Sequence, residues 1–343
     1  MEKKERAGRN QTLTLLPEEI ENLKKQITGA EELRQIAQES TLGGCPAGGQ
    51  EEGKSSDKKN PQAFWDKTIN GNIFDVLPLL PDEFADLIII DPPYNLSKNF
   101  NGFSFAEMSG EKYEEYLDSW LGDVCKKLKP NGSLYLCGDW KCTASLQRSL
   151  EKNLTVMNRI TWQREKGRGA KSNWKNGMED IWFAVKNPKD YYFNVEAVKM
   201  KRKVIAPYKV DGKPKDWDES RDGNFRITYP SNFWDDISIP FWSMPENTDH
   251  PTQKPEKLYA KLILASSKEG DLVFDPFLGS GTTNVVAKKL GRHFCGVEMN
   301  EEYCLWAAKR LLRAESDRSI QGYKNNVFWE RNSLGEQKKL EKK

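Results

Sequence analysis

The tetrapeptide Asp91-Pro92-Pro93-Tyr94 follows directly on the apolar run DLIII at 86–90. Two successive prolines fix φ and remove two backbone N–H donors, so we expect a rigid corner at the end of a buried strand. The corner presents the Asp91 carboxylate and the Pro92 carbonyl as a pair of acceptors, which suits a planar amino group with two hydrogens. The ring of Tyr94 offers a face on which a base can stack.

A second chemical signal is the glycine loop 279–281, which lies between a predicted strand ending at Asp275 and a helix opening at Thr282. Glycines let the backbone approach a ligand closely, and a helix N-terminus offers free N–H groups. Glu298 ends the next predicted strand, where a carboxylate can accept both hydroxyls of a ribose. The pattern predicts a nucleoside-cofactor pocket. Because the chain lacks a Walker loop and a full GxGxxG here, a pyrophosphate cofactor is disfavoured.

The elements that must position these residues alternate from residue 64 onward. Strands are expected at 86–90, 133–138, 155–163, 179–186, 271–277 and 293–299. Helices are expected at 73–80, 111–128, 141–151, 254–267, 281–290 and 301–312. Such alternation predicts an α/β fold, a doubly wound and mostly parallel sheet with helices on both faces. Ligands of such sheets bind beyond the carboxyl ends of the strands.

Two segments depart from this rhythm. Residues 1–60 contain helical spacing within 17–40 and then a Gly/Ser/Lys-rich stretch, which we interpret as a charged, flexible N-terminal extension with possible helices. A docking or dimerising helix is the alternative reading of 17–40. Residues 61–343 are expected to form the main domain. Within it, residues 187–253 are rich in proline and have no period, and irregular spans of that length are usually functional.

Composition excludes several classes of protein. The 343 residues carry 53 Lys and Arg against 51 Asp and Glu, so a nucleic-acid surface must be local. No apolar run approaches the roughly 20 residues of a membrane helix, and the first residues lack a secretory signal. Six cysteines without a CxxC pair and two histidines disfavour a metal site. We therefore expect a cytoplasmic protein with reduced thiols, no metal and no membrane partner.

Basic residues concentrate in two stretches with interleaved aromatic residues. Residues 159–175 hold six basic side chains against one acidic, and residues 199–215 hold seven against one. Such runs are typical of phosphate contacts that position a duplex. The candidate DNA-binding residues are Arg164, Lys166, Arg168, Lys171, Lys175, Lys201, Arg202 and Lys203.

Five motifs together resemble a known family, the S-adenosylmethionine-dependent DNA amino-methyltransferases. They are DPPYN at 91–95, WKNGMEDIWFAVK at 174–186, HPTQKP at 250–255, DPFLGSGTT at 275–283 and GVEMN at 296–300. The catalytic half precedes the cofactor half, as in the circularly permuted beta group of restriction–modification systems. The resemblance covers residues 64–312. It implies a permuted Rossmann-like methyltransferase fold, with 187–250 as the target-recognition insert.

The resemblance also implies roles for the tetrapeptide. Asp91 and the Pro92 carbonyl would hold both N–H bonds of the target amino group and favour a pyramidal nitrogen, which attacks the sulfonium methyl in line. Tyr94 would stack on a base that has left the duplex, because its amino group is otherwise paired. Pro93 completes the catalytic corner.

The cofactor residues implied by the resemblance come from distant parts of the chain. The loop Gly279, Ser280, Gly281 and Thr282 would lie beside the methionine part of the cofactor. Thr252 and Lys254 would reach its carboxylate, and Asp275 its amino group. Glu298 would bind the ribose, with Phe277 and Met299 flanking the adenine. Asn72 would read the adenine edge, although some members have Asp there, and Asp91 borders the same pocket.

The expected activity is methylation of adenine N6 in double-stranded DNA by a monomer or homodimer, with a cognate restriction endonuclease in the same system. Cytosine-N4 methylation is the alternative, although those members more often have Ser in place of Asp91. RNA or protein-glutamine methylation would require a different motif order. A DNA-binding protein with an inactive methyltransferase fold is the alternative from another class, and the complete motifs argue against it. The recognition sequence cannot be read from the chain.

Overall fold

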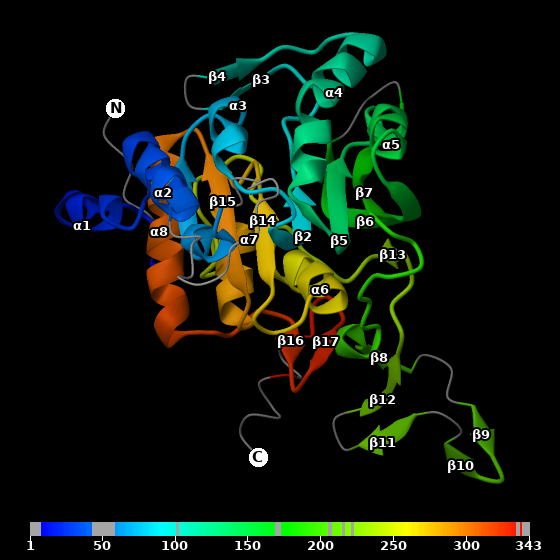
Figure 1. Cartoon of the computed structure of the whole chain (residues 1–343). Coiled ribbons are helices and arrows are strands. Elements are labelled where there is room, and N and C mark those ends of the chain that lie inside the picture. Colours follow the sequence, from blue (N-terminus) through cyan, green and yellow to red (C-terminus); the bar gives the residue numbers. More distant parts are fainter. Residues whose placement is uncertain are drawn as a thin grey trace, which may run out of the picture.

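The computed structural model describes residues 8–42, 59–100, 103–168, 173–204, 208–214, 217–220, 223–333 and 337. Its centre is an eight-stranded sheet in the order β1-β15-β14-β2-β5-β7-β6-β13 (Figure 1). In that order the strands are β1 (Lys67–Asn70), β15 (His293–Glu298), β14 (Leu272–Asp275), β2 (Ala85–Ile90), β5 (Leu128–Gly138), β7 (Asn176–Val185), β6 (Thr155–Arg168) and β13 (Phe233–Trp234). Pairing is parallel from β1 to β5 and between β6 and β13, whereas β7 is antiparallel to both neighbours. The predicted α/β class with a mostly parallel sheet is confirmed.

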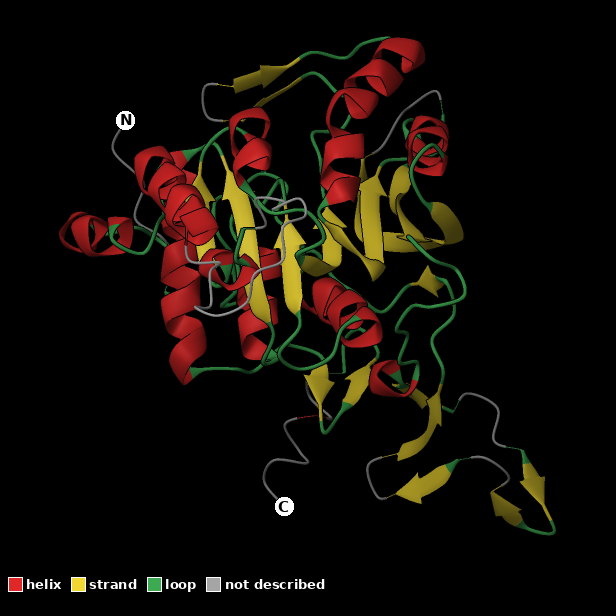
Figure 2. Ribbon diagram, in the orientation of Figure 1, coloured by secondary structure: helices red, strands yellow, loops and turns green. Residues whose placement is uncertain are grey.

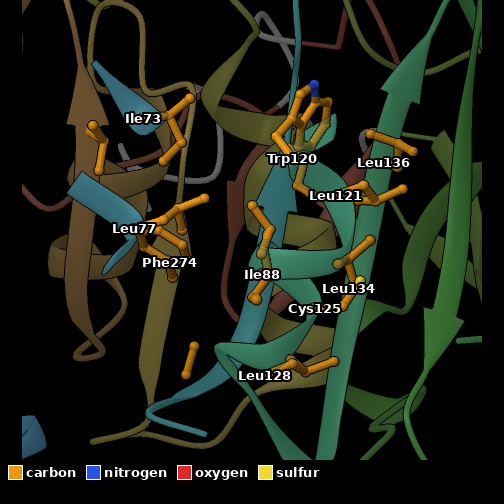
Figure 3. Close-up of a cluster of buried hydrophobic side chains, with 14 of the residues drawn as sticks. Ile73, Leu77, Ile88, Trp120, Leu121, Cys125, Leu128, Leu134, Leu136 and Phe274 are labelled. Atoms are coloured by element: carbon orange, nitrogen blue, oxygen red, sulfur yellow. The ribbon is translucent and has the colours of Figure 1, made fainter. Parts of the chain in front are cut away.

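Helices cover both faces of this sheet, as expected for a doubly wound fold (Figure 2). One face carries α3 (Ile73–Val76), α4 (Gly110–Lys126) and α5 (Thr143–Glu151), and the other carries α6 (Glu256–Ser266), α7 (Thr282–Lys289) and α8 (Glu301–Ser316). Successive residues of β2 alternate between the two cores, with Ile88 and Ile90 in one and Leu87 and Ile89 in the other. Figure 3 shows Trp120 and Leu121 of α4 beside the sheet residues of the first core. Residues 87–90 are all apolar because both faces of the strand are buried there.

Strand order explains how distant motifs meet. β2 lies directly beside β14, and the two are parallel, with Leu87 opposite Val273 and Ile88 opposite Phe274. Asp91 follows the carboxyl end of β2, and Asp275 is the last residue of β14. Both acidic residues therefore leave the same edge of the sheet, where ligands of doubly wound folds bind.

The N-terminal segment differs from the expectation. It forms η1 (Pro17–Glu19), α1 (Ile20–Lys24) and α2 (Ala30–Leu42), which agrees with the helical spacing. However, Leu23 packs against α8, Leu33 is fully buried in the main core, and Thr28 pairs with Ile69 of β1. A solvated extension is therefore wrong for residues 8–42, because their apolar side chains complete the core. The expected linker at 43–58 lies outside the described residues.

The insert forms a second sheet with help from the C-terminal end of the chain. Its order is β11-β12-β8-β17-β16, and the parallel pair β8–β17 joins the insert to the chain's end. The strands are β8 (Met200–Lys203), β11 (Asp218–Ser220), β12 (Gly223–Thr228), β16 (Tyr323–Lys324) and β17 (Val327–Trp329). Asp236 of the insert is buried between Lys257 and Lys261 of α6, at 2.7 Å from each ammonium. The segment after 313, outside the family resemblance, thus supports the insert.

The remaining elements are short. They are η2 (Pro61–Phe64), η3 (Leu77–Leu79), η4 (Glu196–Val198), and the strand pairs β3 (Lys98–Phe100) with β4 (Phe103–Phe105) and β9 (Lys209–Val210) with β10 (Lys213–Pro214). No helix within the described ranges has the length and apolar character needed to cross a bilayer.

Candidate active site

The Asp-Pro-Pro-Tyr corner is held from outside the sheet. The hydroxyl of Tyr113, on α4, donates to the Pro93 carbonyl at 3.0 Å. The side chain of Asn95 bonds both backbone groups of Met108, donating at 2.7 Å and accepting at 2.8 Å. These bonds, added to the fixed φ of two prolines, make the corner rigid where β2 ends.

Both carboxylate oxygens of Asp91 have partners in the protein. Its Oδ1 accepts the hydroxyl of Tyr94 at 2.9 Å, and its Oδ2 lies 2.5 Å from Nζ of Lys254. Oε2 of Glu179, on β7, lies 3.0 Å from the Tyr94 hydroxyl and 3.4 Å from the Lys254 ammonium. The same ammonium lies 5.0 Å from the centre of the Tyr94 ring. The corner thus contains two carboxylates, one ammonium and one phenol in mutual contact.

Burial and the charges of neighbouring groups together shift the pKa values in this cluster. It raises the pKa of Asp91, Lys254 partly offsets that effect, and Glu179 adds to it. Burial alone would lower the pKa of Lys254, but Asp91 and Glu179 outweigh burial and raise it. Burial and the same carboxylates also hold the pKa of Tyr94 well above its ordinary value. At neutral pH the ammonium is charged and the phenol is a hydrogen-bond donor.

Glu179 and Arg164 lie together at the catalytic corner, a position that the sequence motifs predicted for neither residue. Nη1 of Arg164, on β6, lies 2.6 Å from Oε1 of Glu179. Arg164 was expected at a DNA phosphate, and the structure brings it to the catalytic corner. Glu179 had no predicted role, although it lies in the WKNGMEDIWFAVK motif, where it is the first buried residue of β7. An acidic residue at the edge of a buried strand was the available signal.

The glycine loop is fixed by close packing against α8. Gly279 and Gly281 have φ of +56° and +86°, a backbone region that residues with a side chain rarely adopt. A Cβ on Gly281 would lie 2.4 Å from the Cβ of Ala307. Arg310 of α8 donates to the Ser280 carbonyl at 2.9 Å and to the Thr282 hydroxyl at 3.0 Å. No local pattern in the sequence identifies this buried arginine, because its partners Ser280 and Thr282 lie about 30 residues away along the chain.

The loop is also joined to the HPTQKP motif. The Thr282 hydroxyl donates to the Lys254 carbonyl at 3.1 Å. The backbone of Lys254 therefore contacts the predicted cofactor loop, while its side chain contacts Asp91. One residue connects the two predicted halves of the site.

Asp275 and Glu298 are acidic residues that accept hydrogen bonds from neutral groups. Oδ1 of Asp275 accepts the Phe277 N–H at 2.9 Å, and Oδ2 accepts the Thr283 hydroxyl. Glu298 accepts the N–H groups of Gly279 at 2.9 Å and Asn300 at 2.8 Å. Burial raises the pKa of Asp275 to about 7 and also raises the pKa of Glu298. No Lys or Arg in the described part of the chain forms an ion pair with either carboxylate.

These two carboxylates fit the expected cofactor. A buried carboxylate with neutral partners gains a favourable interaction when a cationic amino group binds beside it. Each carboxylate oxygen of Glu298 accepts one N–H bond and retains capacity for a hydroxyl donor. Asp275 and Glu298 therefore suit the amino group and the ribose of S-adenosylmethionine, in that order.

The other predicted cofactor residues are less tightly held. Phe277 is half-buried, with its ring 4.9 Å from that of Trp120, whereas Met299 is 44% exposed. Asn72 is exposed and caps α3 by accepting the Phe74 N–H at 3.1 Å. The neighbouring Gly71 N–H donates to the Glu298 carbonyl at 3.0 Å, so Asn72 follows directly on a residue bonded to Glu298. The backbone N–H of Thr252 donates to Nδ1 of His250 at 3.3 Å.

The predicted DNA-binding cations other than Arg164 fall into three groups. Lys175 and Lys203 are exposed. Lys201 lies over the rings of Phe225 and Trp329, at 4.9 and 4.7 Å from their centres, and Arg202 lies 3.9 Å from Asp235. Lys166 and Arg168 belong to β6, but their side chains, and all of Lys171, lie outside the described residues.

Comparisons with known proteins identify a family to which the chain is similar. A family model described as DNA methylase matches residues 85–309. Type II methyltransferase M.HpaI from Haemophilus parainfluenzae is 35% identical over 247 residues, which cover 71% of this chain and 74% of the relative. DNA adenine methyltransferase YhdJ from Escherichia coli strain K12 is 35% identical over 249 residues, with 71% and 81% covered. The cytosine-N4-specific PvuII DNA methyltransferase shares the fold, with a TM-score of 0.55, 20% identity, and coverage of 71% of this chain and 85% of that one.

Proposed function

The chain belongs to the DNA methylase family, and we propose that it transfers a methyl group from S-adenosylmethionine to N6 of adenine in double-stranded DNA. The observation that carries the proposal is the adjacency of β2 and β14. It brings the Asp91 carboxylate and the Pro92 carbonyl to the same sheet edge as the acidic pocket of Asp275 and Glu298. A pair of acceptors for an amino group thus borders a pocket suited to the methyl donor.

The cofactor supplies an electrophilic methyl group on its sulfonium centre. Asp275 would hold its amino group, Glu298 its ribose hydroxyls, and the loop Gly279 to Thr282 its methionine part. Phe277 and Met299 would border the adenine, with Asn72 at its edge. Thr252 would approach the cofactor carboxylate with Lys254, although the ammonium of Lys254 already contacts two carboxylates.

The corner residues act on the target amino group. An aromatic amine is a weak nucleophile because its lone pair is delocalised into the ring. Asp91 Oδ1 and the Pro92 carbonyl accept its two N–H bonds, which localises the lone pair on nitrogen. The ionised Asp91 is also the acceptor for the proton that the nitrogen loses after alkylation. Tyr94 supports the base once it has left the duplex.

Adenine is favoured over cytosine for two reasons. Asp91 stands where cytosine-N4 enzymes of the group more often have Ser, and the relative YhdJ is named a DNA adenine methyltransferase. Two further relatives, M.HpaI and M2.DpnII, are named Type II methyltransferases. We therefore place the chain as the modification enzyme of a restriction–modification system, with a cognate endonuclease as its functional counterpart. The exposed Lys175 and Lys203 are the first candidates for phosphate contacts.

The test is transfer of isotope-labelled methyl groups to unmethylated genomic DNA, with the product nucleoside identified by mass spectrometry. Wild-type protein is expected to yield labelled N6-methyladenine, and Asp91→Ala to yield none while still binding S-adenosylmethionine. Labelled N4-methylcytosine would correct the base and retain the mechanism. No label in either nucleoside, despite cofactor binding, would contradict the proposed substrate.

A further inference from the structure

Glu179 is a buried carboxylate for which the reaction described above has no use. Its side chain is only 6% exposed, and it reaches the catalytic corner from β7, two strands away from β2. Oε2 lies 3.0 Å from the Tyr94 hydroxyl, and Oε1 lies 2.6 Å from Nη1 of Arg164. Burying an unpaired carboxylate costs free energy. The contacts with Tyr94 and Arg164 therefore stabilise the buried Glu179 side chain.

The Tyr94 hydroxyl faces two acceptors and has one hydrogen. Asp91 Oδ1 is 2.9 Å away and Glu179 Oε2 is 3.0 Å away, so the phenol can donate to only one of them at a time. Lys254 contacts Asp91 Oδ2 at 2.5 Å, so Oδ1, which accepts a bond from the neutral phenol, is the oxygen more available to a target amino group. While Tyr94 donates to Oδ1, the phenol and the target share the lone pairs of that oxygen, and Oδ1 is a weaker acceptor for the target than when Tyr94 donates elsewhere.

We propose that Glu179 is a positioning residue that accepts the Tyr94 hydroxyl hydrogen bond when a target amino group binds Asp91. The exchange requires rotation of the O–H about the C–O bond, and the aromatic ring keeps its place. Arg164 supports the exchange because its guanidinium, 2.6 Å from Oε1, holds the Glu179 side chain in place beside Tyr94. The inference rests on the proposed amino-methyl transfer and adds a residue to that site.

The proposal predicts a specific dependence between two substitutions. Glu179→Gln replaces the charged acceptor by an amide, so Tyr94 stays on Asp91 and kcat falls by about tenfold. Tyr94→Phe removes the hydroxyl and keeps the ring, so its kcat serves as the reference for the second background. In the Tyr94→Phe background, Glu179→Gln has no further effect on kcat, because no hydroxyl remains to be accepted.

The experiment measures single-turnover methyl transfer to unmethylated genomic DNA for wild type, both single variants and the double variant. Cofactor affinity and melting temperature are measured for each. Glu114→Gln is the matched control, because Glu114 also binds an arginine and a lysine, Arg148 at 2.7 Å and Lys152 at 3.0 Å, on the outer surface. It is expected to leave the rate unchanged. If Glu179→Gln unfolds, Arg164→Gln replaces it and should show a smaller loss that Tyr94→Phe also suppresses.

The outcomes separate the inference from the proposed function. If wild-type protein methylates no nucleoside, the proposed function fails and the inference falls with it. If wild type forms N6-methyladenine but Glu179→Gln has no effect, or reduces the rate by the same factor in both backgrounds, the inference alone is overturned. Loss of the effect in the Tyr94→Phe background supports it.

Discussion

The ammonium of Lys254 lies 2.5 Å from Oδ2 of Asp91. A side chain of the HPTQKP motif therefore contacts the Asp-Pro-Pro-Tyr corner. The two residues are 163 positions apart, and both side chains are largely buried. Breaking a buried pair leaves an uncompensated charge, which is costly in a low-dielectric site. Lys254 is therefore the residue that allows Asp91 to remain an ionised acceptor close to Glu179.

Replacing Lys254 by methionine should shift the pH dependence of catalysis. Burial and Glu179 already raise the pKa of Asp91, and loss of the ammonium raises it further. Because the acceptor must be ionised, the acidic limb of the kcat profile moves to higher pH, and kcat at pH 7 falls by at least about tenfold. The measurement is kcat across neutral and mildly alkaline pH. Lys129→Met removes a more exposed lysine that pairs with Asp86 at 2.8 Å, and its profile should match wild type. An unchanged acidic limb in Lys254→Met would contradict this prediction.

Gly281→Ala should disrupt the glycine loop more than its backbone conformation alone requires. A residue other than glycine at φ +86° is strained by about 1–2 kcal/mol, and the added Cβ would also lie 2.4 Å from that of Ala307. We expect a lower melting temperature and loss of S-adenosylmethionine binding. Gly270→Ala separates the two effects, because Gly270 has φ +83° with nothing within 4 Å of the added Cβ. Equal decreases in melting temperature in Gly281→Ala and Gly270→Ala would show that the contact with Ala307 of α8 contributes nothing to the effect.

Cofactor affinity should increase with pH up to about 7. Asp275 has a pKa of about 7 because it is buried, so below that pH much of it is protonated and does not attract an ammonium group. Between about pH 5.5 and 7 the dissociation constant of S-adenosylmethionine should fall by up to about tenfold per pH unit, since titration of an α-amino group begins only near 7.7–8.0. In the same window the cofactor-free protein should lose stability as pH rises, because the raised pKa favours the protonated folded state. Calorimetric binding at several pH values checks this, and Asp275→Asn should bind weakly with a flat profile.

The N-terminal helix α2 should contribute to the stability of the catalytic domain. Leu33 is fully buried in the main core, so Leu33→Ala leaves a cavity and should lower the free energy of unfolding by about 2–5 kcal/mol. The adjacent Arg34 is exposed, and Arg34→Ala should change stability little. Denaturant unfolding of both variants gives the comparison. Equal midpoints would mean that α2 is dispensable for the fold.

Local patterns were sufficient for the architecture around the corner. The apolar run 86–90 had to be a strand buried on both faces, and Pro92 and Pro93 had to end it, because these properties depend on neighbouring residues alone. The loop at Gly279 and Gly281 was identifiable for the same reason, since positive φ and close backbone approach are local requirements. Alternation of strands and helices then implied that Asp91 and Asp275 emerge at one edge of a parallel sheet.

Contacts between distant segments could be decided only by the tertiary structure. The spacing of Leu23 and Leu33 predicts amphipathic helices, but an amphipathic face does not identify the surface that covers it, and only folding showed that these residues complete the core. The positive charge of Arg164 was equally compatible with a phosphate and with Glu179. Sheet order settled that choice, because β6 and β7 are neighbours in the sheet, which brings Arg164 within 2.6 Å of Glu179. The sequence by itself determined which residues could perform the chemistry, whereas the tertiary structure decided which charges neutralise one another, since pairing depends on distances across strands that no local pattern encodes.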